Sequence, residues 1–442
     1  MTAPERFEQD LPRLLAQLAP GTRPDYRDSL VETVERTPQR PAWTFPGRWL
    51  PVDITAQRVG PASAFRVPIT LLLVAALLGV ALFAIAVASR PDLPAPFGPA
   101  QNGRIVYASA GDLYVLESEG ATPQLLLGGL EKDRDPDFSP QGDKLLFLRE
   151  GATGTALYVM RPDGSDLGLV AGPLVGLDWP AWSADGNRIA FTQRPGGMPI
   201  VSVVDTESGT VRDLDVAGQA DPPVAWRPGH PDELLYRGLS EDGTHRLGLV
   251  NVATGAVRPL DIPAEPGAPL QLDFQQVNWS PDGRRLVAVV GGGVTTPGGA
   301  PSTFHKIVDV ANDGTVTGIR PFIHDPDADY EYFGSFTPDG TSILFASQKG
   351  CVFQPWLAPV DDPAAAVALG EPLDHPPGCA TSANVPWIGI IPWMSPDGTR
   401  VLTVKLEGSL EDRVFLGGTD GTDGVPLALT TSGWVSWQRV AP

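Results

Sequence analysis

A five-residue motif that recurs along this chain constrains its fold more than any other feature. It consists of an aromatic residue or Met, here called the anchor, followed by Ser or Thr, Pro, Asp and Gly. The clearest copies are Trp279-Ser280-Pro281-Asp282-Gly283, Phe336-Thr337-Pro338-Asp339-Gly340 and Met394-Ser395-Pro396-Asp397-Gly398. Degenerate copies start at the anchors Phe138, Trp182 and Trp226, and successive anchors are 44, 44, 53, 57 and 58 positions apart. This period is the size of one β-propeller blade.

The composition of the motif predicts a hairpin turn. Proline fixes φ at the first central position, aspartate suits the second, and glycine supplies the positive φ that lets the next strand run back antiparallel. The residues of the three clear copies are therefore interpreted as structural turns. They are not interpreted as a catalytic site.

Strand-like runs follow each motif, and together they predict four strands per blade. First runs lie at 144–148, 188–192, 285–290, 342–346 and 400–404, second runs at 156–160, 199–204 and 413–416, and third runs at 211–214 and 257–260. The remaining strand of each blade, its first along the chain, is the one that leads into the anchor. The expected fold class is therefore all-β.

The two ends of the repeat region predict how the propeller closes. Runs at 104–108, 112–116 and 124–127 resemble a blade without its first strand, and residues 434–439 provide a lone strand with Trp437 in the anchor position, 43 residues after Met394. Pairing the two removes an exposed sheet edge. Seven anchors predict seven blades, with six blades as the alternative.

The anchor-Ser-Pro-Asp-Gly pattern resembles the TolB-like β-propeller repeat, a relative of WD repeats, over about residues 103–440. The resemblance implies a propeller that binds proteins in the periplasm, that accompanies a serine peptidase domain, or that belongs to an anchored protein. TolB itself has six blades, so the count of seven departs from it. The partners of TolB are therefore not carried over to this chain.

A single apolar segment predicts a membrane anchor. Residues 67–88 form an uncharged run of 22 residues between Arg66 and Arg90. A helix of that length spans roughly the 30 Å hydrocarbon core of a bilayer. The alternative is a buried core helix. The sequence Ala86-Val87-Ala88 resembles a signal-peptidase site, but the long leader and the long apolar run favour an uncleaved anchor.

The charges beside this segment predict its orientation. Arg48, Arg58 and Arg66 precede it, whereas Asp92 follows it soon after Arg90. The positive-inside rule places the N-terminus in the cytoplasm. The expected organisation is a cytoplasmic helical segment at 1–65, a transmembrane helix at 66–90, a Pro-rich linker at 91–103 and an extracytoplasmic propeller at 104–442.

The segment 1–65 carries its own apolar pattern. Five residues, Phe7, Leu11, Leu14, Leu15 and Leu18, fall on one helical face, and a second helix is expected around Leu30. The aromatic residues Trp43, Phe45 and Trp49 follow. They are expected to pack on these helices, with the membrane interface or a cytoplasmic protein partner as alternatives.

The formal net charge of the chain, -20, narrows the class of partner. Residues after Arg66 contain 23 basic and 44 acidic side chains. Such a surface repels phosphate backbones, so nucleic acid is not an expected partner.

Several acidic residues are candidates for ligand binding. Five of them lie where loops enter the innermost strands and are predicted to rim one mouth of the central channel: Asp133, Asp135, Asp137, Asp178 and Asp221. The alternative is that they only keep this face soluble. Asp327 and Asp329 alternate with other residues in 324–331, as calcium ligands do, but the Gly and distal Glu of a calcium loop are missing. A solvated acidic loop is therefore favoured, and no metal site is predicted.

The two cysteines, Cys351 and Cys379, are predicted to form a disulfide in an oxidising compartment, with two buried thiols as the alternative. No Cys or His spacing indicates zinc. The chain contains no G-x-S-x-G sequence, so serine hydrolysis is not expected, and no catalytic residue or cofactor is predicted.

These observations favour a membrane-anchored binding or scaffold protein whose propeller recognises a protein, peptide or glycan. A second hypothesis is a transmembrane regulator of the anti-sigma type, with cytoplasmic helices and an external sensor. A third is a propeller lyase or lactonase that uses the acidic channel mouth with a metal. It rests on the fold alone.

Overall fold

The structure is a computed structural model that divides into two compact units, Met1–Arg90 and Pro91–Pro442. It describes residues 97–216, 219–239, 245–260, 262, 271–295, 301–325, 328–374, 388–407, 412–422, 424–431 and 434–441. The predicted segments 1–65 and 66–90 therefore lie outside the described residues, as do residues 91–96 of the linker 91–103. Among the residues that are described, no helix has the length and apolar character needed to cross a membrane.

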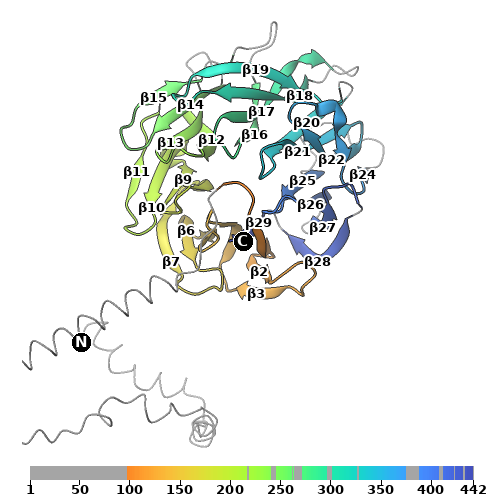
Figure 1. The fold of residues 1–442 in the computed structure, drawn as a ribbon. Helices are drawn as coiled ribbons and strands as arrows, with labels where there is room; N and C mark the ends of the chain where they lie inside the picture. Colours follow the sequence, from red (N-terminus) through yellow and green to blue (C-terminus); the bar gives the residue numbers. More distant parts are fainter. Residues whose placement is uncertain are drawn as a thin grey trace, which may run out of the picture. The chain divides into compact units, whose positions relative to one another are not determined.

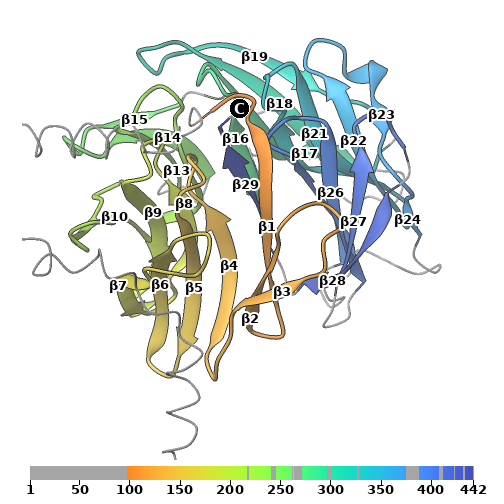
Figure 2. The same cartoon turned by 60° about the horizontal axis from the view of Figure 1, so that its bottom comes forward.

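Antiparallel four-stranded sheets make up most of the second unit, arranged around a common centre (Figures 1 and 2). The first sheet has the order β29 (Val435–Val440), β1 (Gln101–Ser109), β2 (Asp112–Leu116), β3 (Gln124–Leu127). The next contains β4 (Lys132–Phe138), β5 (Leu145–Gly151), β6 (Gly154–Met160) and β7 (Gly168–Leu174). It is followed by β8 (Asp178–Trp182), β9 (Arg188–Gln193), β10 (Ile200–Asp205) and β11 (Val211–Asp213).

The remaining strands continue the same pattern. One sheet contains β12 (Gln219–Trp226), β13 (Glu233–Leu239), β14 (His245–Asn251) and β15 (Val257–Pro259), and another β25 (Ile388–Met394), β26 (Arg400–Glu407), β27 (Asp412–Gly418) and β28 (Val425–Thr431). Between them lie β16 (Gln271–Trp279), β17 (Arg285–Thr295), β18 (Pro301–Val310), β19 (Val316–Phe322), β20 (Tyr330–Phe336), β21 (Ser342–Lys349), β22 (Val352–Pro359), β23 (Val367–Ala368) and β24 (Leu373–Asp374).

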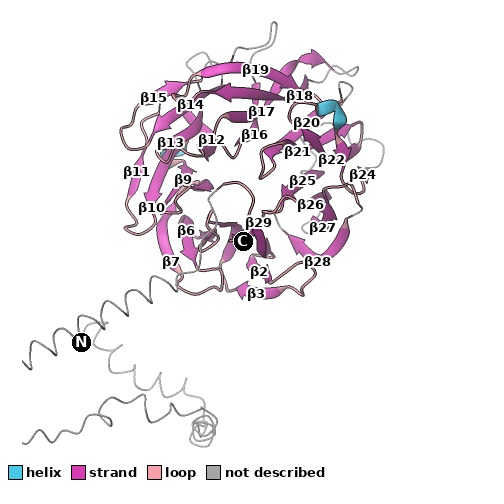
Figure 3. Ribbon diagram, viewed as in Figure 1, coloured by secondary structure: helices cyan, strands magenta, loops and turns pink. Residues whose placement is uncertain are grey.

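These nine strands are grouped as one sheet because a single parallel pair, Thr303 with Tyr330, joins β18 to β20. Strands β16 to β19 and β20 to β24 otherwise form two antiparallel meanders. The described residues contain only two helical turns, η3 (Pro195–Gly197) and η4 (Pro363–Ala365), so the expected all-β class is confirmed (Figure 3).

The apolar core lies between neighbouring sheets. One cluster joins Ala190 and Val203 of the β8–β11 sheet to Trp226 and Leu234 of the β12–β15 sheet. The anchors are nearly all buried, with exposed fractions of 6% for Trp226 and 8% for Trp437. Each sheet therefore buries its inner anchor against the sheet before it, and the repeat is stabilised by its neighbours.

The predicted turn has the hydrogen bonds that its composition implies. The Ser280 hydroxyl donates to Asp282 at 2.6 Å and accepts from the Arg285 N–H at 2.9 Å, and Gly283 N–H donates to the Ser280 carbonyl at 2.9 Å. Partial burial acts to raise the pKa of Asp282, but hydrogen bonds from the Ser280 hydroxyl and the Arg284 N–H hold it below its ordinary value. The turn residues are therefore structural, as the sequence indicates.

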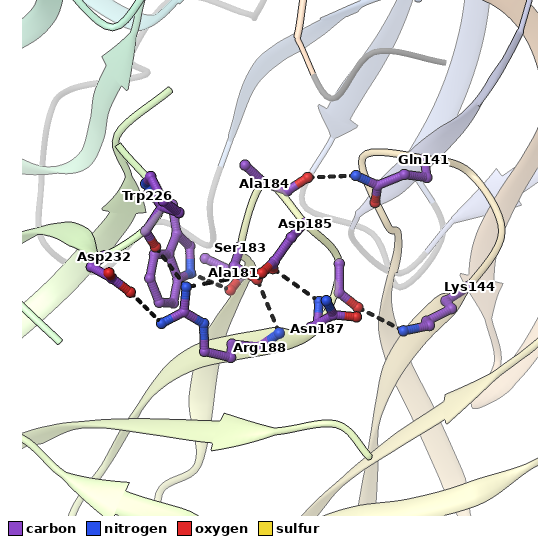
Figure 4. A network of polar contacts seen from close by, with 12 residues as sticks. Gln141, Lys144, Ala181, Ser183, Ala184, Asp185, Asn187, Arg188, Trp226 and Asp232 are labelled. Carbon is purple, nitrogen blue, oxygen red and sulfur yellow. Dashed lines mark hydrogen bonds and ion pairs between the residues drawn. The ribbon is translucent and has the colours of Figure 1, made fainter. Parts of the chain in front are cut away.

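A cation after the turn connects each of several sheets to the next, as Figure 4 shows for Arg188. The Arg188 guanidinium donates to Asp232 at 2.8 Å and lies 5.0 Å from the centre of the Trp226 ring. The Trp226 indole in turn donates to the Ala181 carbonyl at 3.0 Å. Arg285 lies over Phe336 in the same way, at 5.6 Å.

The predicted closure by the C-terminal strand is confirmed. Strand β29 pairs antiparallel with β1, with Trp437 opposite Ile105 and Val435 opposite Tyr107. The Gln438 side chain donates to the Gly142 carbonyl of the next sheet at 2.7 Å. Gly142 has φ +71, and a Cβ there would collide with the carbonyl oxygen of Arg439, so this turn requires glycine.

Candidate functional site

The strands nearest the centre, which hold the anchors, are here called the inner strands. In three of them, β4, β8 and β20, a bulge gives the residue three positions before the anchor a positive φ: Asp135 at 52°, Trp179 at 54° and Phe333 at 61°. Bulges turn a side chain away from the regular pleat. A positive φ in a bulky residue is costly and is found mainly where function requires it.

A cavity of about 480 Å³, here called the tryptophan cavity, lies beside two of these bulges. Its wall contains Arg134 and Asp135 of β4, Asp178 and Trp179 of β8, Trp393 of β25, and Trp434, next to β29. Because these segments come from four sheets, the cavity exists only in the closed ring.

Three indoles that contact one another form part of the apolar wall, which also includes the anchors Met394 and Trp437. The Trp434 ring lies 5.9 Å from that of Trp179 at an interplanar angle of 83°, and 5.8 Å from that of Trp393 at 75°. These edge-to-face contacts fix the three rings against one another. Trp434 remains 38% exposed, which is high for so large an apolar side chain.

The polar part of the wall is a charge cluster around Arg134. Its guanidinium contacts the Asp135 carboxylate, lies 3.2 Å from Asp178 and lies 3.0 Å from Glu150. Burial acts to lower the pKa of Arg134, but the carboxylates raise it, so the group stays charged. Burial raises the pKa of Asp135 despite the neighbouring guanidinium.

Asp137 also borders this cavity, and it is the most perturbed carboxyl group there. Burial raises its pKa to about 7, although the Ser436 hydroxyl, which donates to it at 3.0 Å, acts in the opposite direction. Ser436 also accepts from the Phe138 N–H at 3.0 Å. A group that titrates near neutral pH therefore lies between β4 and the closing strand β29.

A second cavity, of about 620 Å³, lies on the side of the Pro-Asp-Gly turns and shares Trp179, Trp393 and Trp434 with the first. Six inner strands, which come from five sheets, line it, so the two cavities together mark the central channel. The segment before β1 contributes Phe97 to its wall, and Arg439 donates to the Gly98 carbonyl at 2.6 Å. The chain therefore enters the propeller at the turn side of the channel.

The acidic residues predicted as candidates for ligand binding lie in different surroundings. Asp135 and Asp178 line the tryptophan cavity. Asp133 is 2% exposed and accepts two hydrogen bonds from Arg149, at 2.7 and 2.8 Å. Asp329 accepts from the Gly350 N–H at 2.6 Å and lines neither cavity.

Other predicted site residues are described in part or not at all. Asp221 belongs to β12, where its backbone pairs with that of Arg237, and its side chain is outside the description. Asp327 and Cys379 lie outside the described residues. Cys351, in the turn between β21 and β22, is disulfide-bonded, and its pairing with Cys379 stays a prediction. No group of three metal-binding side chains occurs in the described ranges.

The three tryptophans and Arg134 were missed by the sequence reasoning, whereas Asp137 was selected as one of the acidic residues before the first anchor. A signal for part of this set exists, because Asp135, Trp179, Phe333 and Trp434 all lie three positions before an anchor. Aligning the repeats on their anchors would have selected that position. Trp393 precedes its anchor directly and has no such signal.

A buried polar cluster elsewhere has a structural explanation. Glu331 lies 3.2 Å from His305 Nδ1 and accepts from the His324 N–H at 3.1 Å. Burial acts to raise the pKa of Glu331, but these partners lower it to about 2. The cluster joins β18 to β20 and lines neither cavity of the channel.

Comparison with known proteins identifies the fold. No protein-family model matches the sequence, and no curated protein matches it. Among solved structures, oligogalacturonate lyase in complex with manganese is 14% identical, with a TM-score of 0.52, over 74% of this chain and 91% of the lyase. A prolyl endopeptidase is 13% identical, with a TM-score of 0.52, over 78% of this chain and half of the peptidase.

TolB from Acinetobacter baumannii also matches, at 14% identity and a TM-score of 0.43, over 78% of this chain and 68% of TolB. The matches are thus TolB-like and propeller-type proteins, and the β-propeller fold predicted from the turn motif is confirmed. Identities this low carry the fold and nothing about activity.

Proposed function

We propose that this chain is a membrane-anchored binding or scaffold protein whose extracytoplasmic propeller recognises its partner at the tryptophan cavity. In this proposal residues 66–90 cross the membrane, 91–103 form the spacer, and 104–442 form the binding module. The observation that carries it is the indole wall of Trp179, Trp393 and Trp434, in which Trp434 is exposed and which is held in part by a strained bulge.

The proposal includes a ring of seven blades. Five four-stranded sheets and the two meanders of the nine-stranded sheet, which share one bridge pair, give that number. A blade boundary at Thr303 and Tyr330 accounts for the joined sheet, because one parallel pair contributes little to sheet stability.

Binding is favoured over catalysis by the state of the polar groups in the cavity wall. Asp135 and Asp178 are paired with Arg134, and Asp137 is held by Ser436. The described wall contains no His, Cys or Lys that could act as a nucleophile. An exposed aromatic surface with a polar rim is instead typical of recognition sites.

The test is to isolate complexes of the tagged full chain from its native membrane. Trp434→Ala should lose the partner that the wild-type chain retains, because it removes the central indole. Leu125→Ala is the matched control, since Leu125 is 60% exposed on β3 at the opposite edge of the same sheet. Loss of the partner in the control only would contradict the proposal.

A further inference from the structure

The geometry of the tryptophan cavity points to a specific ligand chemistry: we propose that it binds an alkylammonium group. This inference rests on the proposed function and names what the binding site recognises. The shared chemistry is a positively charged nitrogen with an apolar coat, as in choline or in a lysine side chain.

The first reason is the orientation of the indoles. Trp179 and Trp393 both stand nearly perpendicular to Trp434, at 83° and 75°, and all three rings line one cavity. A ligand in the cavity therefore meets aromatic surface in more than one direction. Aromatic faces attract cations through their quadrupole, and tryptophan does so most strongly.

The second reason is the sign of the local charge. The titratable groups in the wall are Asp135, Asp137, Asp178 and a single base, Arg134. That base is already shared among Asp135, Asp178 and Glu150. The field in the cavity is therefore negative, which disfavours an anion and favours a cation.

The third reason is that a neutral or anionic ligand would use only part of this wall. A neutral group of the same shape gains the apolar contact but no attraction to the ring faces or carboxylates. An anion would have to compete with three carboxylates for Arg134. Cavities of several hundred Å³ hold small organic ligands, so about 480 Å³ accommodates an ammonium head group with part of its carrier.

The experiment is a calorimetric titration of the purified full chain in a maltoside detergent, which contains no choline. The two probes are choline and 3,3-dimethylbutan-1-ol, a neutral analogue of the same shape. We expect choline to bind about 3- to 30-fold more tightly than the alcohol, the range that a cation–π contact supplies. Its affinity should fall with added salt.

Two variants locate the binding. Trp434→Ala should weaken choline binding by a similar factor, and Asp178→Asn, which leaves every ring in place, should weaken choline binding but not binding of the alcohol. Leu125→Ala should change neither. The Asp178 variant keeps the test valid if Trp434→Ala disturbs the fold, which near-ultraviolet circular dichroism would detect.

Equal affinity for the two probes, or binding that both cavity variants leave unchanged, would overturn the inference. So would failure of choline and of Nα-acetyl-lysine methylamide to bind at all. If only the lysine derivative binds, the ammonium group comes from a peptide, and the inference stands. The wild-type chain could also retain a partner that the Trp434→Ala variant loses and yet bind neither choline nor the lysine derivative. That result would reject this inference and leave the proposed function intact.

Discussion

Replacement of Asp137 by asparagine measures how much an ionised carboxylate beside the closing strand β29 lowers the free energy of unfolding. Asparagine has nearly the same shape, and its oxygen can still accept the Ser436 hydroxyl that lies 3.0 Å from Asp137. In the folded protein burial raises the pKa of Asp137 to about 7, compared with 3.8 for the free side chain. The variant removes this titration and little else.

The sign follows from proton binding. Between about pH 4 and pH 7 the folded protein retains a proton on Asp137 that the unfolded chain has released, so stability decreases as pH rises. A difference of about three pH units corresponds to at most about 4 kcal/mol. Because Asp137 also borders the cavity and keeps some solvent contact, we expect about half of that.

The assay is urea denaturation of residues 91–442 at pH 4 and pH 8. The free energy of unfolding of Asp137→Asn should exceed that of the wild type by an amount that grows by about 2 kcal/mol between the two pH values. Other titrating groups are common to both proteins and cancel. Ser436→Ala, which removes the donor to the ionised carboxylate, should destabilise more at pH 8 than at pH 4. A difference that stays constant with pH would refute the reasoning.

Three further predictions concern the closure, the cysteines and the topology. Deletion of 432–442 removes β29, leaves the edge of β1 unpaired and should cause aggregation; a truncated protein that stays monomeric with an unchanged melting temperature would rule out this role for β29. Cys351→Ala and Cys379→Ala should each destabilise by about 3 to 4 kcal/mol, and the double variant no further; two reactive thiols in the unfolded, non-reduced protein would exclude the bridge. A reporter fused after Pro442 should be active only if it functions outside the membrane; activity of a cytoplasmic reporter would reverse the predicted orientation.

The strands and their closure could be predicted because they depend on local chemistry repeated along the chain. Each Pro-Asp-Gly turn determines its own hairpin, and the position of Trp437 after Met394 assigns β29 to the sheet of β1. The continuous apolar runs of β5, β9 and β21, which are buried on both faces, belong to the same local pattern. The fold therefore followed from the period of the anchors.

The site could be predicted only in part because it depends on contacts between distant sheets. Asp135 and Asp178 were selected from their place before an inner strand. The Arg134 guanidinium, which both carboxylates contact, was not selected, because its contact with Asp178 joins two sheets. The pKa of Asp137 depends on Ser436, almost 300 positions away in sequence. No local pattern carries that information.

The positive φ at Trp179 explains why the sequence did not predict this tryptophan as a site residue. A tryptophan in a strand that leads into an anchor would ordinarily be interpreted as one more core residue. The bulge between Asp178 and Ala181 instead turns this position, and its ring meets that of Trp434 from another sheet. Bulges of this kind have no strong sequence signature when glycine is absent.

Site-specific photocrosslinking in living cells tests most directly whether the tryptophan cavity is the binding site. A photoreactive phenylalanine derivative, which keeps an aromatic ring at the substituted position, is placed at Trp434 in one strain and at Leu125, at the outer edge of the same sheet, in another. We predict a crosslinked adduct at position 434 that choline suppresses, and none at position 125. Adducts at position 125 without any at position 434 would contradict the assignment of the binding site to the channel.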